Sequence, residues 1–367
     1  MGISADTLEK FTRTAKVFYE EQGNILQGGK LGIDQFLFGV DDLDTSANFT
    51  LDNLIVNPHG VSFRNRDEQS HVRPFENGSG KVYEVPHVSE KTPISETLMD
   101  AVVAGIEATG GLDVATQSKV AKIVNQHVAA HTATRWKLAL DTIRTGVFSP
   151  TGLQGRDIGL QIDYGRDASL SITYDFTAVG ANVDEALFEL YDAYRNQGGN
   201  QEAICIVAGS DWLTEFQKDE DVLTRMQANA ANILVRQALM PPELRNVQGL
   251  YLIAEYLIPG TLTPVFICGY QPRYEFIQYA GASATAFMPS DEAIIFSIGD
   301  PRYRVFRGVD ALDGSGNKVR TVGEIVFDGF VTQDPVNEWL RSQSRFAFVP
   351  GNVNRTGKSK GTFTAAS

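Results

Sequence analysis

The sequence predicts an α+β fold, and three stretches carry that prediction. Residues 112–146 contain no proline and no glycine before Gly146, and their apolar residues recur at helical spacing. Residues 47–94 hold short strand-like pieces separated by Asn-Pro and Asn-Gly-Ser-Gly turn signals. Residues 183–310 mix helical and strand patterns in a way that suits one α/β unit. We therefore expect a long helix, an extended ribbon and a compact unit.

The long stretch predicts a single helix that acts as a spine. Asp113 is a suitable N-cap, and Gly146 stands where a helix usually ends. At ~1.5 Å per residue, a helix of about 32 residues is roughly 50 Å long, which exceeds the usual length of about three turns. Its apolar stripe comprises Val120, Val124, Val128, Trp136, Leu140 and Ile143.

The N-terminal part predicts segments that cannot form a core alone. Residues 23–34 are rich in glycine and lack clear periodicity, so we interpret them as an extended arm that takes its contacts from a neighbour. The ribbon at 47–94 has too few apolar residues for its own core, and a two-stranded ribbon is marginal by itself. The arm could bury a short apolar patch formed by Phe36, Leu37, Phe38 and Val40.

The remaining chain alternates helical and strand patterns. Helices are expected at 95–108, 183–197, 211–228 and 231–240, and strands at 203–209, 249–258, 263–270 and 291–299. Two alternating strands at 158–164 and 170–176 are expected to pair across a Gly-Arg-Asp turn, and 303–332 predicts a hairpin around Asp313–Gly316. The polar tail at 354–367 is expected to be mobile unless a neighbour holds it.

Composition and charge restrict the class of protein. Of 367 residues, 43% are hydrophobic and 21% are charged, which suits a folded chain. No run approaches the roughly 18 apolar residues of a membrane span, and the N-terminus lacks an apolar signal-peptide core, so we expect a cytoplasmic chain without membrane contact. The formal net charge of −13 disfavours general nucleic-acid binding, because phosphate contact needs clustered Lys and Arg.

Two motifs with a possible metal or phosphate role fail a structural requirement. His127 and His131 have the spacing of a helical zinc pair, but Val128 takes the place of the zincin Glu and no third ligand is evident. We expect interface or solvated histidines instead. The 351–359 stretch resembles a phosphate loop, but it has one residue too many between its glycines and too little chain after it for a helix.

Other candidate residues favour structural roles. Asp310 begins a stretch that lacks the Gly and Glu positions of a calcium loop and predicts a hairpin turn. Cys205 and Cys268 lie in apolar runs and are expected to be buried free thiols. We assign no catalytic, cofactor-binding or metal-binding residue and expect no cofactor. Because extended elements without a core usually bury their apolar side against another copy, the sequence favours a large homo-oligomer.

The order of these parts resembles the major capsid protein of tailed bacteriophages, and specifically the lambda-type capsid protein E family. The matching stretches are the spine with 147–167, then 183–216, and finally 331–354, where Asp334-Pro335 is expected to start a helix before a last apolar strand. The resemblance covers about 47–354. Each motif is short, and the specificity comes from their order along the chain.

The resemblance implies the Hong Kong-type capsid fold. Residues 1–46 would be the N-terminal arm, and 47–94 the extended loop that lies across an adjacent subunit. A peripheral domain would comprise 95–182, with the spine at 112–146, together with the returning segment and tail at 311–367. Residues 183–310 would form the axial domain at five-fold and six-fold vertices. Lys81 lies in the loop that some members crosslink, but an exposed ribbon lysine is the simpler interpretation.

The resemblance also implies the function and the partners. The chain would assemble through pentamers and hexamers into the icosahedral head shell, first as a procapsid, and would be a structural virion protein, not an enzyme. It would enclose double-stranded DNA without sequence-specific binding. A portal protein, a separate scaffolding protein (because only about 46 residues precede the ribbon) and a decoration protein are the expected partners. Assembly is expected in the host cytoplasm.

Two alternatives remain open at this point. An encapsulin-like nanocompartment shell would share the fold and hold an enzyme cargo. An α/β enzyme would have a ligand pocket in 183–310 and would be a monomer of about 40 kDa. The oligomeric state and the contents of any particle distinguish the three classes.

Overall fold

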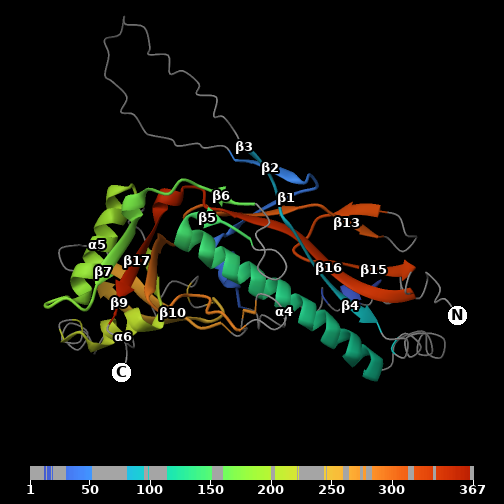
Figure 1. Ribbon diagram of the computed structural model, residues 1–367, viewed down its shortest axis with the longest axis horizontal. Helices are drawn as coiled ribbons and strands as arrows, with labels where there is room; N and C mark the ends of the chain where they lie inside the picture. Colours follow the sequence, from blue (N-terminus) through green and yellow to red (C-terminus); the bar gives the residue numbers. More distant parts are fainter. Residues whose placement is uncertain are drawn as a thin grey trace, which may run out of the picture.

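The structure of the chain is a computed structural model, shown in Figure 1. It describes residues 30–51, 81–94, 114–150, 160–199, 203–220, 246–258, 264–272, 283–312, 318–333 and 336–363, with single residues and short pieces at 12–13, 15–17, 19, 98, 222, 244 and 276–277. Several expected segments lie outside the described residues. These are the tip of the ribbon at 52–80, the helix at 95–108 apart from Leu98, the end of the 211–228 helix, the helix at 231–240 and the turn at 313–317.

The described helices and strands follow the expected mixture. In chain order they are α2 (Ile33–Leu37), β1 (Val40–Asp44), β2 (Asn48–Leu51), β3 (Lys81–Glu84), β4 (His87–Ile94), α4 (Val114–Thr145), β5 (Val147–Phe148), β6 (Ile162–Asp163), the 3-10 turn Ala168–Leu170, β7 (Ser171–Asp175), α5 (Val183–Asn196), β8 (Ile204–Ala208), α6 (Ser210–Lys218), β9 (Leu250–Leu257), β10 (Pro264–Tyr270), β11 (Glu292–Ser297), β12 (Tyr303–Arg307), β13 (Val309–Leu312), β14 (Lys318–Thr321), β15 (Val326–Gln333), β16 (Val336–Val349), the 3-10 turn Val353–Arg355 and β17 (Thr356–Thr362).

Two larger sheets organise the molecule. The six-stranded sheet has the order β7-β17-β11-β8-β10-β9, and the five-stranded sheet has the order β1-β12-β16-β15 with β4 also paired to β16. Figure 1 shows the six-stranded sheet with α5 and α6 at one end of an elongated molecule and β4, β15 and β16 toward the other. The helix α4 runs between these ends.

The helix α4 joins the two sheets through its apolar stripe. Val120, Val124 and Val128 pack in a cluster with Phe327 and Leu340 of the five-stranded sheet. Farther along, Trp136, Leu140 and Ile143 enter a larger core that contains residues of both sheets. The expected spine at 112–146 is therefore confirmed, with observed bounds of 114–145, and Gly146 has a φ of +73° that suits a residue ending a helix. Asp113, the expected N-cap, lies outside the described residues.

The position of β8 and β11 between two apolar clusters explains their continuous apolar runs. Ile206 of β8 and Ile295 of β11 face the cluster built with α5 and α6, whereas Val207 and Ile294 face the core shared with α4. A strand covered on both faces needs apolar residues at every position. The expected helix at 183–197, here α5, and the expected strands β8, β9, β10 and β11 are confirmed.

Three expectations about local structure are wrong. The strands at 162–163 and 171–175 do not pair with each other, because a 3-10 turn separates them and β6 pairs with β5 while β7 pairs with β17. No helix follows Asp334-Pro335, since the next described residue, Val336, already starts β16. The polar tail is not free at 356–362, because β17 lies between β7 and β11 and pairs with both.

Half of the apolar patch expected in the arm is buried within the same chain, whereas Val40 is 42% exposed. Leu37 is 1% exposed and Phe38 is fully buried, and α2 packs against α4. The next segment, β1, pairs in parallel with β12. This part of the N-terminal segment therefore has contacts within its own subunit.

Candidate functional site

The ribbon formed by β2 and β3 is anchored at the edge of the main body. Asn48 to Leu51 pair in antiparallel register with Lys81 to Glu84, so the two strands are adjacent at Leu51 and Lys81. Phe49 stacks on Tyr83 with ring centroids 5.8 Å apart, and Val85 is buried in the core, whereas Val82 is 64% exposed. The ribbon continues into β4, which pairs with β16, so its base is part of the five-stranded sheet.

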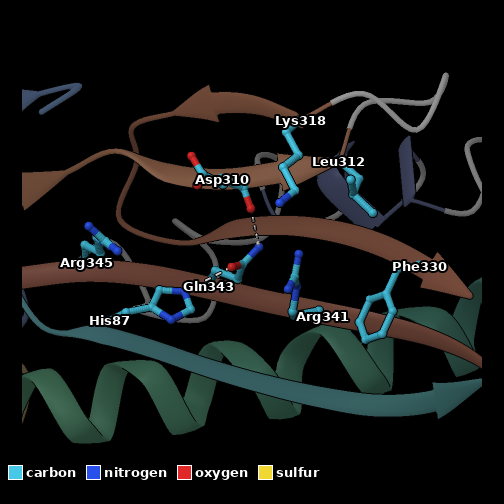
Figure 2. A pocket seen from close by; sticks show the side chains of 8 residues that line it. All are labelled: His87, Asp310, Leu312, Lys318, Phe330, Arg341, Gln343 and Arg345. Atoms are coloured by element: carbon cyan, nitrogen blue, oxygen red, sulfur yellow. Dashed lines mark hydrogen bonds between the residues drawn. The ribbon is translucent and has the colours of Figure 1, made fainter. Parts of the chain in front are cut away.

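A pocket of about 430 Å³ lies beside the base of this ribbon. Figure 2 shows that β16 contributes alternate residues, Arg341, Gln343 and Arg345, and that Lys318 reaches toward them from the β13–β14 hairpin. Because side chains alternate along a strand, Ser342 and Ser344 lie on the opposite face. The remaining lining residues are His87, Asp310, Leu312 and Phe330.

One buried carboxylate behind the pocket holds several of its lining residues. Asp328 is fully buried and accepts hydrogen bonds from Nε and Nη2 of Arg341, the former at 2.9 Å. It also accepts from Nε2 of Gln343 at 3.2 Å and from the backbone N–H of Leu312 at 3.2 Å. Oε1 of Gln343 lies 3.0 Å from Nε2 of His87, which fits an N–H donor on that imidazole nitrogen. The hydrogen bond to Asp328 raises the pKa of Arg341.

The opposite face of β16 forms a polar network with the spine. Oγ of Ser342 lies 2.8 Å from Nδ1 of His127 and 2.9 Å from Nε2 of His131, and Nε2 of His127 lies 2.7 Å from Oγ1 of Thr92. With both imidazoles neutral, the Ser342 hydroxyl can donate to one and accept from the other. Burial lowers the pKa of His127 to about 4 and, with the charge of Arg135 nearby, that of His131 to about 3.

This network corrects the expectation that the two histidines are at an interface or solvated. His127 is 1% exposed and His131 is 2% exposed within a single chain. Among the described residues, no group of His, Cys, Asp and Glu is arranged to hold a metal ion. The pair instead connects α4 to β4 and β16 by hydrogen bonds.

A second buried polar cluster connects the N-terminal segment to the spine. Asp34 of α2, which is 1% exposed, lies 3.4 Å from Nε of Arg135 and 3.5 Å from Nη1 of Arg304. Glu324 lies 3.3 Å from Arg135 and 2.9 Å from Arg304. Burial opposes ionisation of Glu324, but these two arginines more than compensate and lower its pKa. The cluster fixes α2 on the body by electrostatic contacts.

The other candidate residues have structural surroundings. Cys205 and Cys268 are free and fully buried, with their Sγ atoms 3.8 Å apart, as the sequence predicted. Lys358 of the phosphate-loop-like stretch lies in β17, with Nζ 3.6 Å from Glu292. Within the described part of the chain, no helix is both long enough and apolar enough to span a membrane.

Comparison with solved structures identifies the fold. The capsid protein of a prophage of E. coli CFT073 superimposes with a TM-score of 0.56 and 11% identity, covering 99% of this chain and 100% of that one. The mature capsid of bacteriophage PhiM1 is more distant, with a TM-score of 0.43, 11% identity and coverage of 90% of this chain and 87% of that one. The holo-SrpI encapsulin complex of Synechococcus elongatus PCC 7942 has a TM-score of 0.39 and 7% identity, with coverage of 88% and 84%. The chain therefore has the Hong Kong-type fold of shell-forming capsid proteins.

Comparison of the sequence identifies the family. A comparison with curated proteins found no match. The family model for the phage major capsid protein E matches residues 49–354, and the chain belongs to this family. It is a major capsid protein, and its function is to form the shell of a bacteriophage head. The family is one of structural proteins of the virion, which confirms the class that the sequence predicted.

The sequence did not reveal the pocket or the histidine network. The alternation Arg341-Ser342-Gln343-Ser344-Arg345 was visible in the chain and is typical of a strand whose two faces have different surroundings. Asp328 of the adjacent strand β15 is 13 residues from Arg341, but the other partners, from β4, α4 and β13, lie between 33 and 256 residues away. No local pattern specifies such distant contacts.

Proposed function

We propose a division of labour among the parts of this capsid subunit. Residues 1–46 act as the N-terminal arm, and 47–94 extend over a neighbouring subunit. Residues 95–182 and 311–367 form the peripheral domain, and 183–310 form the axial domain, with β7 and β17 completing its sheet. Membership of the capsid protein E family carries the proposal, and the two separate sheets joined by α4 are consistent with two such domains.

The ribbon supports the role of the extended loop. Its described part contributes few side chains to the core, and Val82 presents an apolar surface to solvent. Apolar surface on an extended element is stabilised when another subunit covers it. Many modest contacts of this kind, repeated over a closed shell, give a stable assembly without one dominant interface.

The net charge of −13 fits a shell that encloses DNA without gripping it. A portal protein and a separate scaffolding protein complete the proposed head-assembly pathway in the host cytoplasm, and a decoration protein is a further candidate partner. The subunit acts in this pathway as a structural component, with no catalytic step of its own.

Electron microscopy of the purified protein, expressed alone and together with its scaffolding protein, tests the shell. Closed shells, or rings of five and six subunits, are expected. Packaged DNA identifies a phage head, whereas an enzyme cargo would identify a compartment. A monomer under both conditions would contradict the proposal.

A shortened ribbon tests the proposed role of residues 47–94. Because Leu51 lies opposite Lys81, a two-residue Asn-Gly turn can replace 52–80 and close the hairpin. We expect a folded subunit that no longer forms shells. Shells of normal yield and stability would show that the ribbon is not an assembly element.

A further inference from the structure

The pocket beside the ribbon contains two cations whose charge is incompletely balanced. Nε and Nη1 of Arg345 are buried and make no hydrogen bond with the described residues. The nearest carboxylate to Nη1 is Glu84 at 3.9 Å, and the Glu84 side chain is 70% exposed. Lys318 is exposed and forms no ion pair among the residues that the structure describes. Buried donors without acceptors are unfavourable, so Arg345 in particular calls for an anionic group.

The acidic residue that lines the pocket, Asp310, and the buried Asp328 behind the lining have other partners. Asp328 is saturated by Arg341, Gln343 and Leu312. Asp310, which is 64% exposed on its side chain, lies 3.9 Å from Arg320. Figure 2 shows Arg345 and Lys318 at separate places around the pocket, with Gln343 between them and Arg341 below Lys318. An acidic side chain entering the pocket would therefore meet the two Arg345 donors that have no acceptor among the described residues, and the ammonium group of Lys318.

We propose that this pocket receives a carboxylate side chain from a neighbouring copy of the chain in the shell. Each copy carries 45 acidic and 32 basic residues, so copies repel one another on average. Close packing of such copies needs local sites where opposite charges meet. A pocket with spare cations provides such a site, and the excess of carboxylates on the next copy provides the ligand. The inference rests on the shell-forming function described above.

The position of the pocket agrees with a contact between copies. Its rim includes His87, the first residue of β4, and Glu84, the last residue of β3, lies beside Arg345. The pocket is thus next to the base of the ribbon that we assign to inter-subunit contact. A carboxylate bound here would also attract Arg345 away from its weak contact with Glu84 and hold the two copies in register.

Charge removal with a matched control tests the proposal. Lys318→Gln with Arg345→Gln changes the net charge from −13 to −15, and so does the control Lys119→Gln with Lys122→Gln, which removes two exposed charges of α4 outside the proposed axial domain. By light scattering and electron microscopy, we expect the pocket variant to assemble at least tenfold more slowly and the control to stay within about twofold of the unaltered chain. Equal assembly of both variants would overturn the proposal.

A second measurement locates the carboxylate directly. Shells are assembled from equal amounts of ¹⁴N- and ¹⁵N-labelled chains and treated with a carbodiimide, which joins an amine to a carboxylate in contact with it. Mass spectrometry is expected to find Lys318 joined to an Asp or Glu peptide of the other isotope. Lys318 joined only to peptides of its own isotope would overturn the assignment in favour of a partner within the same chain. Lys318 protected from the carbodiimide reaction only in DNA-filled shells would overturn it in favour of a phosphate partner.

The two tests remain informative if one variant misfolds. Lys318 is exposed, so Lys318→Gln alone is expected to keep the melting temperature of the free subunit and still slow assembly severalfold. Shell formation by the unaltered chain tests the function itself. If the unaltered chain forms no shells, both proposals are overturned. If it forms normal shells and the pocket variant assembles equally well, only the proposal that the pocket binds a carboxylate is overturned.

Discussion

The central strands of the two sheets differ in the side chains that they bury. In the six-stranded sheet, β8 and β11 present mostly apolar residues to both faces. In the five-stranded sheet, β16 presents Ser342 to the spine and Gln343 to the pocket, and both are buried. Apolar burial is non-directional, whereas buried hydrogen bonds require each donor to meet its acceptor.

This difference implies two kinds of stability in one subunit. The six-stranded sheet depends on buried apolar area, which is insensitive to pH and tolerates conservative changes of shape. The five-stranded sheet combines apolar packing with buried hydrogen-bonded pairs, so single polar substitutions and protonation act there most strongly. The contact between α4 and β16 is therefore the part of the subunit that responds most to solution conditions.

Acidification is expected to have the largest effect. Unfolded histidines titrate near 6.5, whereas His127 and His131 in the folded chain have a pKa of about 4 and about 3. The unfolded state thus binds protons first, and the free energy of unfolding falls as the pH drops below 6.5. We expect a loss of about 2 kcal/mol for each histidine by pH 5, measured by urea unfolding at several pH values.

A double variant tests whether this pH dependence comes from His127 and His131. His127→Gln with His131→Gln is expected to remove most of the slope between pH 6.5 and 5. The groups that face the pair are Arg135 on the same helix and His87 on β4, with Thr92 and Ser342 as neutral hydrogen-bond partners. His87→Gln, the control, should retain most of the slope. A wild-type profile that is flat in this range would contradict the account.

Removal of the buried carboxylate is expected to have the next largest effect. Asp328→Ala leaves Arg341 and the N–H of Leu312 without their acceptor and removes one of two acceptors of the Gln343 amide. Breaking a buried ion pair in this way costs about 3–5 kcal/mol of unfolding free energy. Glu215→Ala, which breaks an exposed pair with Lys218, should cost no more than about 1 kcal/mol. Similar losses for both would show that the buried pair is not special.

A truncation in the six-stranded sheet sharpens the contrast. Ile295 is fully buried, and Ile295→Ala should lower the free energy of unfolding by about 2–5 kcal/mol, against about 0.5–1.5 kcal/mol for Ile295→Val. Because no titratable group is removed, the loss should be the same at pH 7 and pH 5. Urea midpoints at the two pH values provide the measurement. A loss that varies with pH would contradict the view that the six-stranded sheet is insensitive to pH.

Two serines on one face of β16 give the smallest and most specific test. Ser342 and Ser344 are both fully buried, but Ser342 serves two histidines, whereas Oγ of Ser344 makes no hydrogen bond with the described residues. Ser342→Ala should cost about 1–3 kcal/mol, and Ser344→Ala should be close to neutral. Equal costs in thermal or urea unfolding would show that the histidine network contributes little.

Much of the local structure was predictable because its causes are local. The apolar stripe of α4 and the apolar runs of β8 and β11 indicate a helix and buried strands without reference to any partner. The errors occur where local pattern and long-range pairing compete. The Gly-Arg-Asp sequence at 165–167 resembles a hairpin turn, yet β7 pairs with β17, a strand from the far end of the chain.

The candidate site was predictable only in part. The order of motifs identified the capsid family, since that order reflects the whole architecture and not one residue. His127 and His131 stood out by spacing, but their burial against Ser342 was not foreseeable, because burial depends on which strand covers the helix. The pocket depends on four separate segments brought together by the five-stranded sheet.

The sequence by itself determined the long helix, most of the strands, the buried thiols and the class of protein, because propensity, periodicity and motif order are properties of the chain. Tertiary structure alone decided that 356–362 completes the six-stranded sheet, that α2 is buried in its own subunit, and that Arg345 lacks a full partner. Those outcomes depend on contacts between residues far apart in the chain, whose burial and geometry are set by the fold and not by local sequence pattern.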